Sequence, residues 1–334
     1  MKKPPLRIVS IGGGTGLSAL LHGLKHATTP VDLTAVVTVT DDGGSSGRLR
    51  RDFDILPPGD IRNCMVALSE DEALLSRLFQ YRFEGGSGLK GHSFGNLFLT
   101  ALTHITGDFA LAVKQSSEVL KIRGHIFPST SENVELEAVL EDGSLVYGET
   151  KISRSRRHIS TIRLRPRDCK PLPETLDAIA AADLITLGPG SLFTSVIPNL
   201  LVAGIPEAIR ASRAAKVYFV NLMWQPGETT RFRASDHIRA IHQHAGGKLI
   251  DVAVVNSGAI RLAARRRYAR EQAEPVENDL DHIRAMGVQV VLADLVLQTE
   301  VVRHDPRKAA IAALRLARGN RRKSEAPEEN KISL

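Results

Sequence analysis

The sequence is poor in the residues that build several common kinds of site. Only Cys64 and Cys169 are cysteines among 334 residues, which excludes a disulfide framework or a cysteine-based zinc site. Aromatic residues make up 4% of the chain, so stacking platforms for bases are few and a nucleic-acid partner is not expected. No apolar run approaches the roughly 18 residues that a membrane span needs. The Met1–Pro5 segment leads into a strand-like run too short for a signal peptide, and we predict a cytoplasmic protein.

The residues that are present describe an ordinary globular protein. Hydrophobic residues make up 43% and charged residues 24%, enough for one large α/β domain or two smaller ones. The formal net charge is +7, and much of the excess lies in Arg265–Arg267, Arg270 and the tail Arg318–Lys323. Such runs are typical of a solvated face or a flexible end, and the alternative is contact with an anionic surface.

The N-terminal third predicts a β-loop-α-β unit and therefore a parallel sheet. A strand over Arg7–Ile11 is followed by leucines 17, 20, 21 and 24, which have helical spacing. The run Thr34–Thr40 is β-branched and continuous, as in a strand buried on both faces. Helices are expected over Leu74–Phe79 and Leu97–Leu102.

A β-rich excursion at about 123–168 interrupts this pattern. Its strands are expected over Val134–Leu140, Leu145–Lys151 and Ile159–Arg165, with Asp142-Gly143 as a hairpin turn. The parallel pattern then resumes, with strands expected over Asp183–Leu187, Lys216–Val220, Asp251–Val255 and Val288–Leu292. Asp305-Pro306 opens a terminal helix through Ala317. We predict one α/β domain over 1–318, with a mostly parallel sheet, and a disordered basic and polar tail over 319–334.

A glycine loop follows the first strand, where a helix begins. Gly12, Gly13, Gly14, Thr15 and Gly16 let the backbone approach an anion, and the helix N-terminus supplies free N–H groups. The loop is not a complete dinucleotide fingerprint, because Leu17 stands where the third glycine belongs, and no lysine makes it a Walker loop. We interpret it as a phosphate-binding loop, with a simple tight turn as the alternative.

A second glycine loop follows the second strand and contributes Asp41, Asp42, Gly43, Ser45, Ser46 and Arg48 to the candidate site. An acid here accepts hydrogen bonds from ribose, holds Mg²⁺ against phosphate, or only forms a turn. Arg48 suits phosphate oxygens. Asp60, in the rigid turn Pro57–Asn63, lines the same cleft or caps a helix.

A third loop ends a later strand and contributes Gly188, Pro189, Gly190, Ser191 and Ser195. Because ligands of open parallel sheets bind outside the carboxyl ends of the strands, the three loops are expected to converge on one crevice. Asn96 and Asn221 are added as amide contacts to substrate, base or sugar. Trp224 either stacks on a ring or packs in the core.

The order of these motifs resembles the gluconeogenesis factor family, which is related to the phospholactate transferases of deazaflavin coenzyme synthesis. The resemblance covers nearly all of residues 7–310, including Arg303–Pro306 near the end, and is most specific in Asp41–Arg50, Pro57–Asn63 and Gly188–Leu201. It departs from the usual pattern at Trp224 and Thr230. The resemblance implies a Rossmann-like core with helices on both faces of the sheet, UDP-sugar binding and a role in cell morphogenesis and cell-wall synthesis. In the transferase branch, it also implies Mg²⁺ on acids at the positions of Asp41 and Asp60.

The leading hypothesis is a binding protein for a UDP-sugar such as UDP-N-acetylglucosamine, with no catalytic residue and no required cofactor. Its expected state is a homo-oligomer with a cell-wall-synthesis or regulatory protein partner. The alternative is a Mg²⁺-dependent transferase of a phosphorus-containing group from a nucleotide-diphosphate-linked donor. A third reading, a dinucleotide-binding oxidoreductase, is disfavoured by the broken fingerprint, although NAD fits the same diphosphate crevice.

Overall fold

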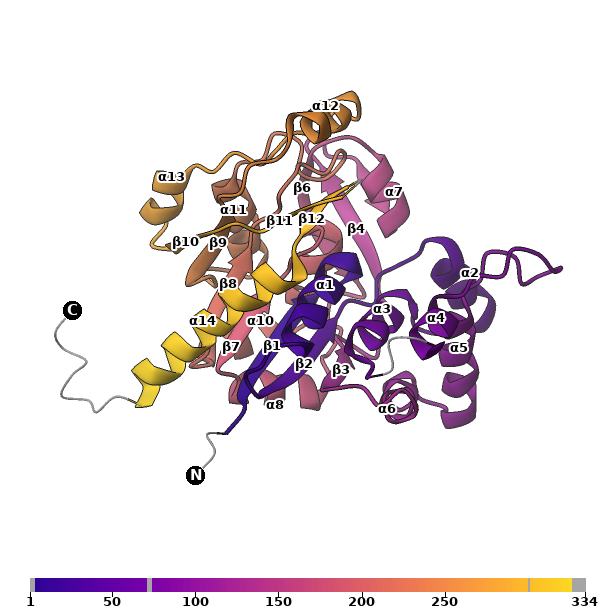
Figure 1. Ribbon diagram of the computed structural model, residues 1–334. Helices are drawn as coiled ribbons and strands as arrows, with labels where there is room; N and C mark the ends of the chain where they lie inside the picture. Colours follow the sequence, from indigo (N-terminus) through magenta and orange to yellow (C-terminus); the bar gives the residue numbers. More distant parts are fainter. Residues whose placement is uncertain (1–3, 71–73, 300, 326–334) are drawn as a thin grey trace.

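The computed structural model describes residues 4–70, 74–299 and 301–325, and its centre is a seven-stranded parallel sheet (Figure 1). The strand order is β10-β9-β8-β7-β1-β2-β3, and every pair in it is parallel. The strands are β1 (Leu6–Gly12), β2 (Val31–Val37), β3 (His125–Pro128), β7 (Leu184–Leu187), β8 (Ala215–Phe219), β9 (Val252–Asn256) and β10 (Gln289–Ala293). The α/β fold class with a Rossmann-like sheet is therefore confirmed.

The chain changes direction of winding between β1 and β7, which are neighbours in the sheet. Successive strands run from β1 to β3 on one side and from β7 to β10 on the other. Because parallel crossovers are right-handed, the helices of the two halves cover opposite faces. This arrangement creates a switch point at the carboxyl ends of β1 and β7.

The first half carries α1 (Gly14–Lys25), α2 (Gly44–Phe53), α3 (Gly59–Leu68), α4 (Leu74–Gln80), α5 (Phe94–Thr106) and α6 (Phe109–Val119). The second half carries α8 (Pro173–Ala181), the π-helix η1 (Leu192–Val196), α9 (Ile197–Leu200), α10 (Ile205–Ala211), α11 (Ala234–His244), α12 (Leu262–Arg270) and α13 (Leu280–Ala285). The buried faces of α1 and the sheet meet in one apolar core, in which Leu17, Leu20, Leu21 and Leu24 are fully buried.

The β-rich excursion forms a separate antiparallel sheet of β5 (Leu145–Tyr147), β4 (Glu135–Leu140) and β6 (Ile159–Arg165). The expected strand over Leu145–Lys151 is wrong in its second half, because α7 (Glu149–Arg154) begins directly after β5. The segment from His125 to Pro128 lies inside the predicted excursion but joins the edge of the main sheet beside β2. Because this segment pairs with a strand that is distant in the sequence, its own residues carry no pattern that distinguishes it from the strands of the excursion.

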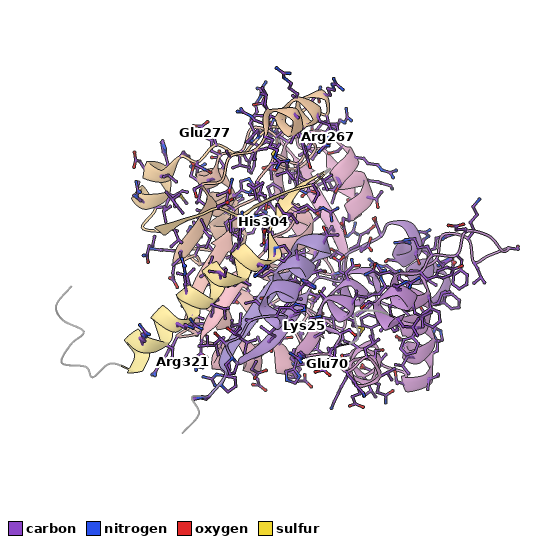
Figure 2. The ribbon with its side chains drawn as sticks, in the orientation of Figure 1. Lys25, Glu70, Arg267, Glu277, His304 and Arg321 are labelled. Carbon is purple, nitrogen blue, oxygen red and sulfur yellow. The ribbon has the colours of Figure 1, made fainter. Side chains whose placement is uncertain are left out.

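Two more elements follow β10. The hairpin of β11 (Val296–Gln298) and β12 (Val302–His304) leads into α14 (Pro306–Glu325), which packs beside α1 (Figure 1). The predicted disorder from Gly319 is wrong over 319–325, and residues 326–334 lie outside the described residues. Arg321 donates to the carbonyl oxygens of Pro4 (2.8 Å) and Pro5 (2.6 Å) and pairs with Asp183, which holds the helix end against the sheet (Figure 2).

The basic residues 265–267 and 270 lie on α12, of which no residue is buried, so they form a solvated face. Within the described residues, no single helix is both long and apolar enough to cross a membrane. The bent pair Leu192–Leu200 and Ile205–Ala211 meets that test only when the two helices are taken together.

Candidate functional site

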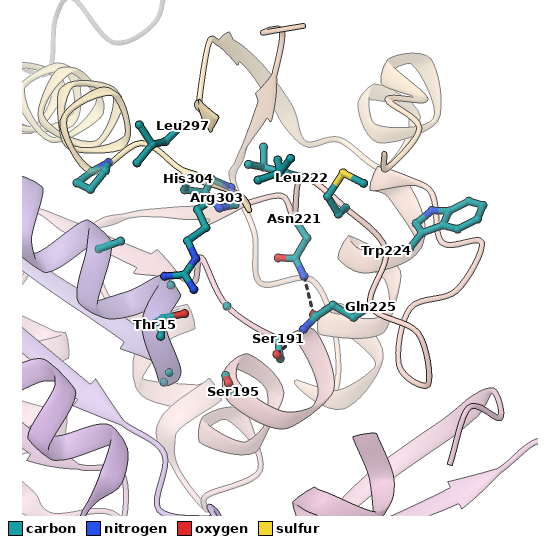
Figure 3. Close-up of a pocket in the computed structure, with 18 of the residues that line it drawn as sticks. Thr15, Ser191, Ser195, Asn221, Leu222, Trp224, Gln225, Leu297, Arg303 and His304 are labelled. Carbon is teal, nitrogen blue, oxygen red and sulfur yellow. Dashed lines mark hydrogen bonds between the residues drawn. The ribbon is translucent and has the colours of Figure 1, made fainter. Parts of the chain in front are cut away.

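A cavity of about 430 Å³ opens at the switch point, outside the carboxyl ends of β1, β7 and β8. Figure 3 shows its walls: the loop that begins α1 stands on one side, and the loop after β7 and the segment after β8 stand on the other. The predicted site residues in this wall are Gly13, Gly14, Thr15, Gly16, Gly190, Ser191, Ser195 and Asn221.

Close packing explains two of the glycines in the first loop. A Cβ atom added to Gly16 would lie 2.4 Å from the carbonyl oxygen of Pro189 in the third loop, and one added to Gly13 would lie 2.6 Å from Asp60 Oδ2 in α3. Both distances are far below van der Waals contact, so a larger residue at Gly16 would push the first and third loops apart, and one at Gly13 would displace Asp60. Gly12, Gly188 and Pro189 lie behind the cavity wall and hold this packing.

The N-terminus of α1 presents free backbone N–H groups to the cavity. Its N-cap, Gly13, has no side chain to bond them, and no acidic residue lies in the first turn. The N–H of Gly14 donates to Asp60, whereas those of Thr15 and Gly16 have no acceptor in the described part of the chain. Unpaired amides at the positive end of a 12-residue helix form a ready site for an anion.

The third loop is different, because its helix N-terminus is already neutralised from within. The carboxylate of Glu228 accepts the N–H groups of Phe193 and Thr194 and the hydroxyl of Thr194 (3.2 Å). Burial raises the pKa of Glu228, and these hydrogen bonds oppose that shift. The loop therefore contributes the shape of the wall and the polar groups of Gly190, Ser191 and Ser195.

A ladder of side-chain amides forms the wall opposite α1. The Asn221 amide donates to Gln225 Oε1 at 3.1 Å, and the Gln225 amide donates to Ser191 Oγ at 2.6 Å (Figure 3). Trp224 lies at the far edge, where its indole N–H donates to the Phe232 carbonyl at 3.0 Å and its ring points away from the centre of the cavity. The indole is therefore held by its own loop, and its ring is not placed to stack on a ligand in the centre of the cavity.

The hairpin β11–β12 closes the cavity from above. Tyr268 Oη accepts the N–H of Val302 at 3.0 Å, and His304 Nε2 donates to the Val220 carbonyl at 3.1 Å. Burial lowers the pKa of His304 to about 4, so this ring is neutral near neutral pH. Between these two anchors, the guanidinium group of Arg303 projects toward Thr15 (Figure 3).

Arg303 is the functional residue that reasoning from sequence missed. It lies within the family-like run Arg303–Pro306, but its role has no local signal, since it is a single charge in a short strand. In the described part of the chain it has no carboxylate within ion-pair distance. Tyr268, Leu297 and His304 also line the cavity and were likewise not predicted as site residues, whereas the chain from Asn221 to Thr229, which includes Gln225, was considered as a base or sugar contact.

The second glycine loop lies away from this cavity, contrary to the expected convergence of three loops. Asp41, Asp42, Gly43, Ser45, Ser46, Arg48 and Asn96 are not part of its wall. The Asn96 amide donates to Ser45 Oγ (3.2 Å) and Ser46 Oγ (3.4 Å), which ties α5 to α2. Asp42 caps α7, and Arg48 donates to the Lys90 carbonyl at 2.9 Å. The loop is thus occupied by contacts inside the protein.

Three carboxyl groups gather behind the first loop. Burial, followed by the charge of Asp41, raises the pKa of Asp60 to about 6. Burial together with the charges of Asp41 and Asp60 raises the pKa of Glu149 well above its usual range. Even so, the described residues contain no group of three acidic, histidine or cysteine side chains with the geometry to hold a metal ion. The expected Mg²⁺ site uses only the two carboxyl groups of Asp41 and Asp60, which Mg²⁺ supplements with waters or phosphate oxygens, so it stays a prediction.

The fold and the crevice define a Rossmann-like protein whose first glycine loop lies at the switch point of a parallel sheet. The chain belongs to the CofD family, whose description is 2-phospho-L-lactate transferase and whose sequence model matches residues 8–296. It is 51% identical over 315 residues to the gluconeogenesis factor of Halalkalibacterium halodurans, an alignment covering 94% of this chain and 97% of that protein. It is 50% identical over 310 residues to the gluconeogenesis factor of Bacillus subtilis, covering 92% and 96%.

A solved structure has the same fold. The crystal structure of a UPF0052 family member from Bacillus halodurans has a TM-score of 0.90 and is 50% identical, covering 93% of this chain and all of that one. The predicted family relationship is confirmed by both kinds of comparison.

Proposed function

We propose that the crevice binds a nucleotide-diphosphate sugar, and that the protein acts as a nucleotide-sugar sensor rather than as an enzyme. The single observation that carries this proposal is that the N–H groups of Thr15 and Gly16 face the guanidinium of Arg303 across one cavity, and that none of these groups has a partner in the described part of the chain. A diphosphate placed between them would receive backbone hydrogen bonds from one side and a charge-assisted bond from the other.

The remaining wall suits the rest of such a ligand. Asn221 and Gln225 offer amide donors and acceptors beside Ser191, which is the chemistry needed to read a base edge or sugar hydroxyls. A volume of about 430 Å³ falls within the usual range for small-molecule sites. Asp41 and Asp42, earlier candidates for a ribose contact, lie elsewhere, so we place the ribose near the amide ladder.

Isothermal titration calorimetry with UDP-N-acetylglucosamine tests this site. Gly190→Glu adds a carboxylate to the wall, and its Cβ meets only ordinary contacts at 3.4 Å, so the variant should fold but lose measurable binding. Arg303→Gln should weaken binding by about tenfold or more, the cost of one charge-assisted hydrogen bond. Gly85→Glu and Arg167→Gln, at exposed positions outside the cavity, are the matched controls. Equal affinity in all five proteins would refute the site.

The cellular role that we propose follows from the family rather than from the cavity. The name of the gluconeogenesis factors above supports a requirement during growth on gluconeogenic carbon sources. We add to this proposal the effects on cell shape and wall synthesis that the sequence resemblance implies. Cells that lack the protein should be misshapen under those conditions. The wild-type gene should restore their shape, whereas the Gly190→Glu gene should not. Full rescue by Gly190→Glu would separate the cellular role from the crevice.

A transferase is the second candidate, and the acids behind the first loop favour it. Asp60 borders Gly13, and its raised pKa is of the kind found at functional carboxyl groups. The description of the family as phospholactate transferase supports the same class of reaction. Incubation with nucleotide-diphosphate-linked donors, with and without Mg²⁺, tests it: release of nucleotide that disappears in Asp60→Asn would favour the transferase, and no release under any condition would exclude it.

A further inference from the structure

A second cavity, of about 610 Å³, lies beside the first and is separate from the amide ladder. It is bounded by α1, α3 and α4, and it shares only Thr15, Ala19 and Arg303 with the first cavity. Its polar lining consists of Thr15, Ser18, His22, Asn63, Ser76 and Gln80 together with Arg62, Arg82 and Arg303. No acidic residue is present among the described residues that line it.

Arg62 is the most unusual of these arginines, because it is buried and has no carboxylate within ion-pair distance among the described residues. The residue is 7% exposed, and its Nη2 donates to the neutral side chain of Asn63 at 2.7 Å. Its Nη1 makes a long contact of 3.5 Å with the Phe79 carbonyl, and its Nε has no acceptor within the described chain. Burying a cation in this way is costly unless an anion compensates it.

Arg82 adds to that cost instead of relieving it. Its guanidinium donates only to the Gly91 carbonyl at 3.2 Å, and no carboxylate lies within ion-pair distance of it in the described residues. The positive charge of Arg82 lowers the pKa of Arg62, an effect second only to burial, and the carboxylates of Asp60 and Asp41, beyond ion-pair distance, only partly oppose it. Two like charges facing one cavity repel each other, and an anion between them would turn that repulsion into attraction.

We propose that this second cavity binds a phosphomonoester, held by Arg62, Arg82 and Arg303 beside the nucleotide crevice. A phosphomonoester carries up to two negative charges and three acceptor oxygens, which matches several guanidinium groups better than a single carboxylate does. Because Arg303 borders both cavities, the two ligands would share one cation. Binding of the second ligand would then change how Arg303 interacts with a ligand in the nucleotide crevice.

Calorimetric titration of inorganic phosphate into the full-length protein, in a buffer free of other phosphates, tests the cavity. Arg82 is exposed, so Arg82→Gln should fold normally and weaken phosphate binding by about tenfold. Arg62→Lys keeps the charge but loses the planar fork, and a similar loss is expected. Arg77→Gln, an exposed arginine on α4 that lines neither cavity, is the matched control and should bind phosphate normally.

Two further measurements distinguish phosphate binding in the second cavity from binding in the nucleotide crevice. Gly190→Glu obstructs only the first cavity, so it should retain phosphate binding even if binding of UDP-N-acetylglucosamine is lost. Acetate, a carboxylate of similar size, should bind at least about tenfold more weakly than phosphate. Thermal melting of each variant shows that it is folded.

Phosphate binding that survives in Arg82→Gln and Arg62→Lys, or that disappears in Gly190→Glu, would overturn the proposal and place the anion in the nucleotide crevice. Acetate that binds as well as phosphate would overturn the phosphomonoester class. Failure of UDP-N-acetylglucosamine to bind the wild-type protein would refute only the nucleotide site, because the phosphate arms do not depend on it.

Discussion

Asp42 caps a helix that begins more than a hundred residues later in the chain. Its Oδ1 accepts the backbone N–H of Thr150 at 2.8 Å and the hydroxyl of Thr150 at 2.5 Å, in the first turn of α7. The carboxylate is therefore committed to joining the small antiparallel sheet to the end of β2. Its neighbour Asp41 bonds the N–H of Gly43 at 2.9 Å and closes its own turn. Both carboxylates thus accept hydrogen bonds within the protein, and those of Asp42 join distant parts of the chain.

Asp42→Ala should lower the free energy of unfolding by about 1 kcal/mol, the usual effect of losing a helix cap. The affinity for UDP-N-acetylglucosamine should not change, because Asp42 lies outside the crevice wall. Urea unfolding followed by circular dichroism measures the first quantity and calorimetry the second. Asp52→Ala removes the same charge from an exposed position nearby and serves as control. A large loss of affinity with unchanged stability would return Asp42 to the binding site.

Gly16→Ala should destabilise the fold by about 1–3 kcal/mol, because its Cβ would overlap the carbonyl group of Pro189 and separate the two loops. Nucleotide-sugar binding should weaken in the same variant, since the amides of Thr15 and Gly16 would move. Gly85→Ala, with no atom near its added Cβ, should match the wild type in both measurements. A Gly16→Ala protein with wild-type stability and affinity would show that the loops separate freely.

Gln225→Leu should weaken UDP-N-acetylglucosamine binding by about tenfold, because both steps of the amide ladder are lost while volume is kept. Gln243→Leu, at an exposed position on α11, is the control. If calorimetry gave the same dissociation constant for both variants, the ladder would be a packing feature and not a recognition element.

The free energy of unfolding should depend on pH because the pKa of Asp60 is raised in the folded protein. Its pKa is about 6 in the folded protein against an ordinary 3.8, so the folded state holds the proton more tightly than the unfolded state. Asp60 is half-buried, and its contribution to stability is complete below pH 4 and disappears as the pH rises through 6. The difference corresponds to about 3 kcal/mol.

Asp60→Asn isolates this effect from other titrating groups. His304 acts in the opposite direction: its folded pKa of about 4 lies below the ordinary 6.5, so its stabilising contribution is present above 6.5 and falls with decreasing pH. Subtracting the two stability curves removes that background. Urea unfolding at pH 4.5 and pH 7.5 should show the wild type losing stability relative to Asp60→Asn. Parallel curves would mean that Asp60 ionises normally.

The sequence by itself determined the parallel sheet and the first loop of the site. Continuous apolar runs such as Thr34–Thr40 mark buried parallel strands, and the glycines from 12 to 16 mark a close backbone approach, because both patterns depend on neighbours within one element. The same reasoning named Gly190, Ser191, Ser195 and Asn221, which the fold brings to the crevice wall.

Only the tertiary structure decided which polar residues face a ligand. Asp42 and Arg303 are both charged side chains next to strands, yet the first is consumed by a helix cap and the second is left free above the crevice. The distinction rests on partners contributed by distant parts of the chain: Thr150 for Asp42, and none in the described chain for Arg303. Local sequence reports what a side chain can bind, whereas folding determines whether the protein has already bound it.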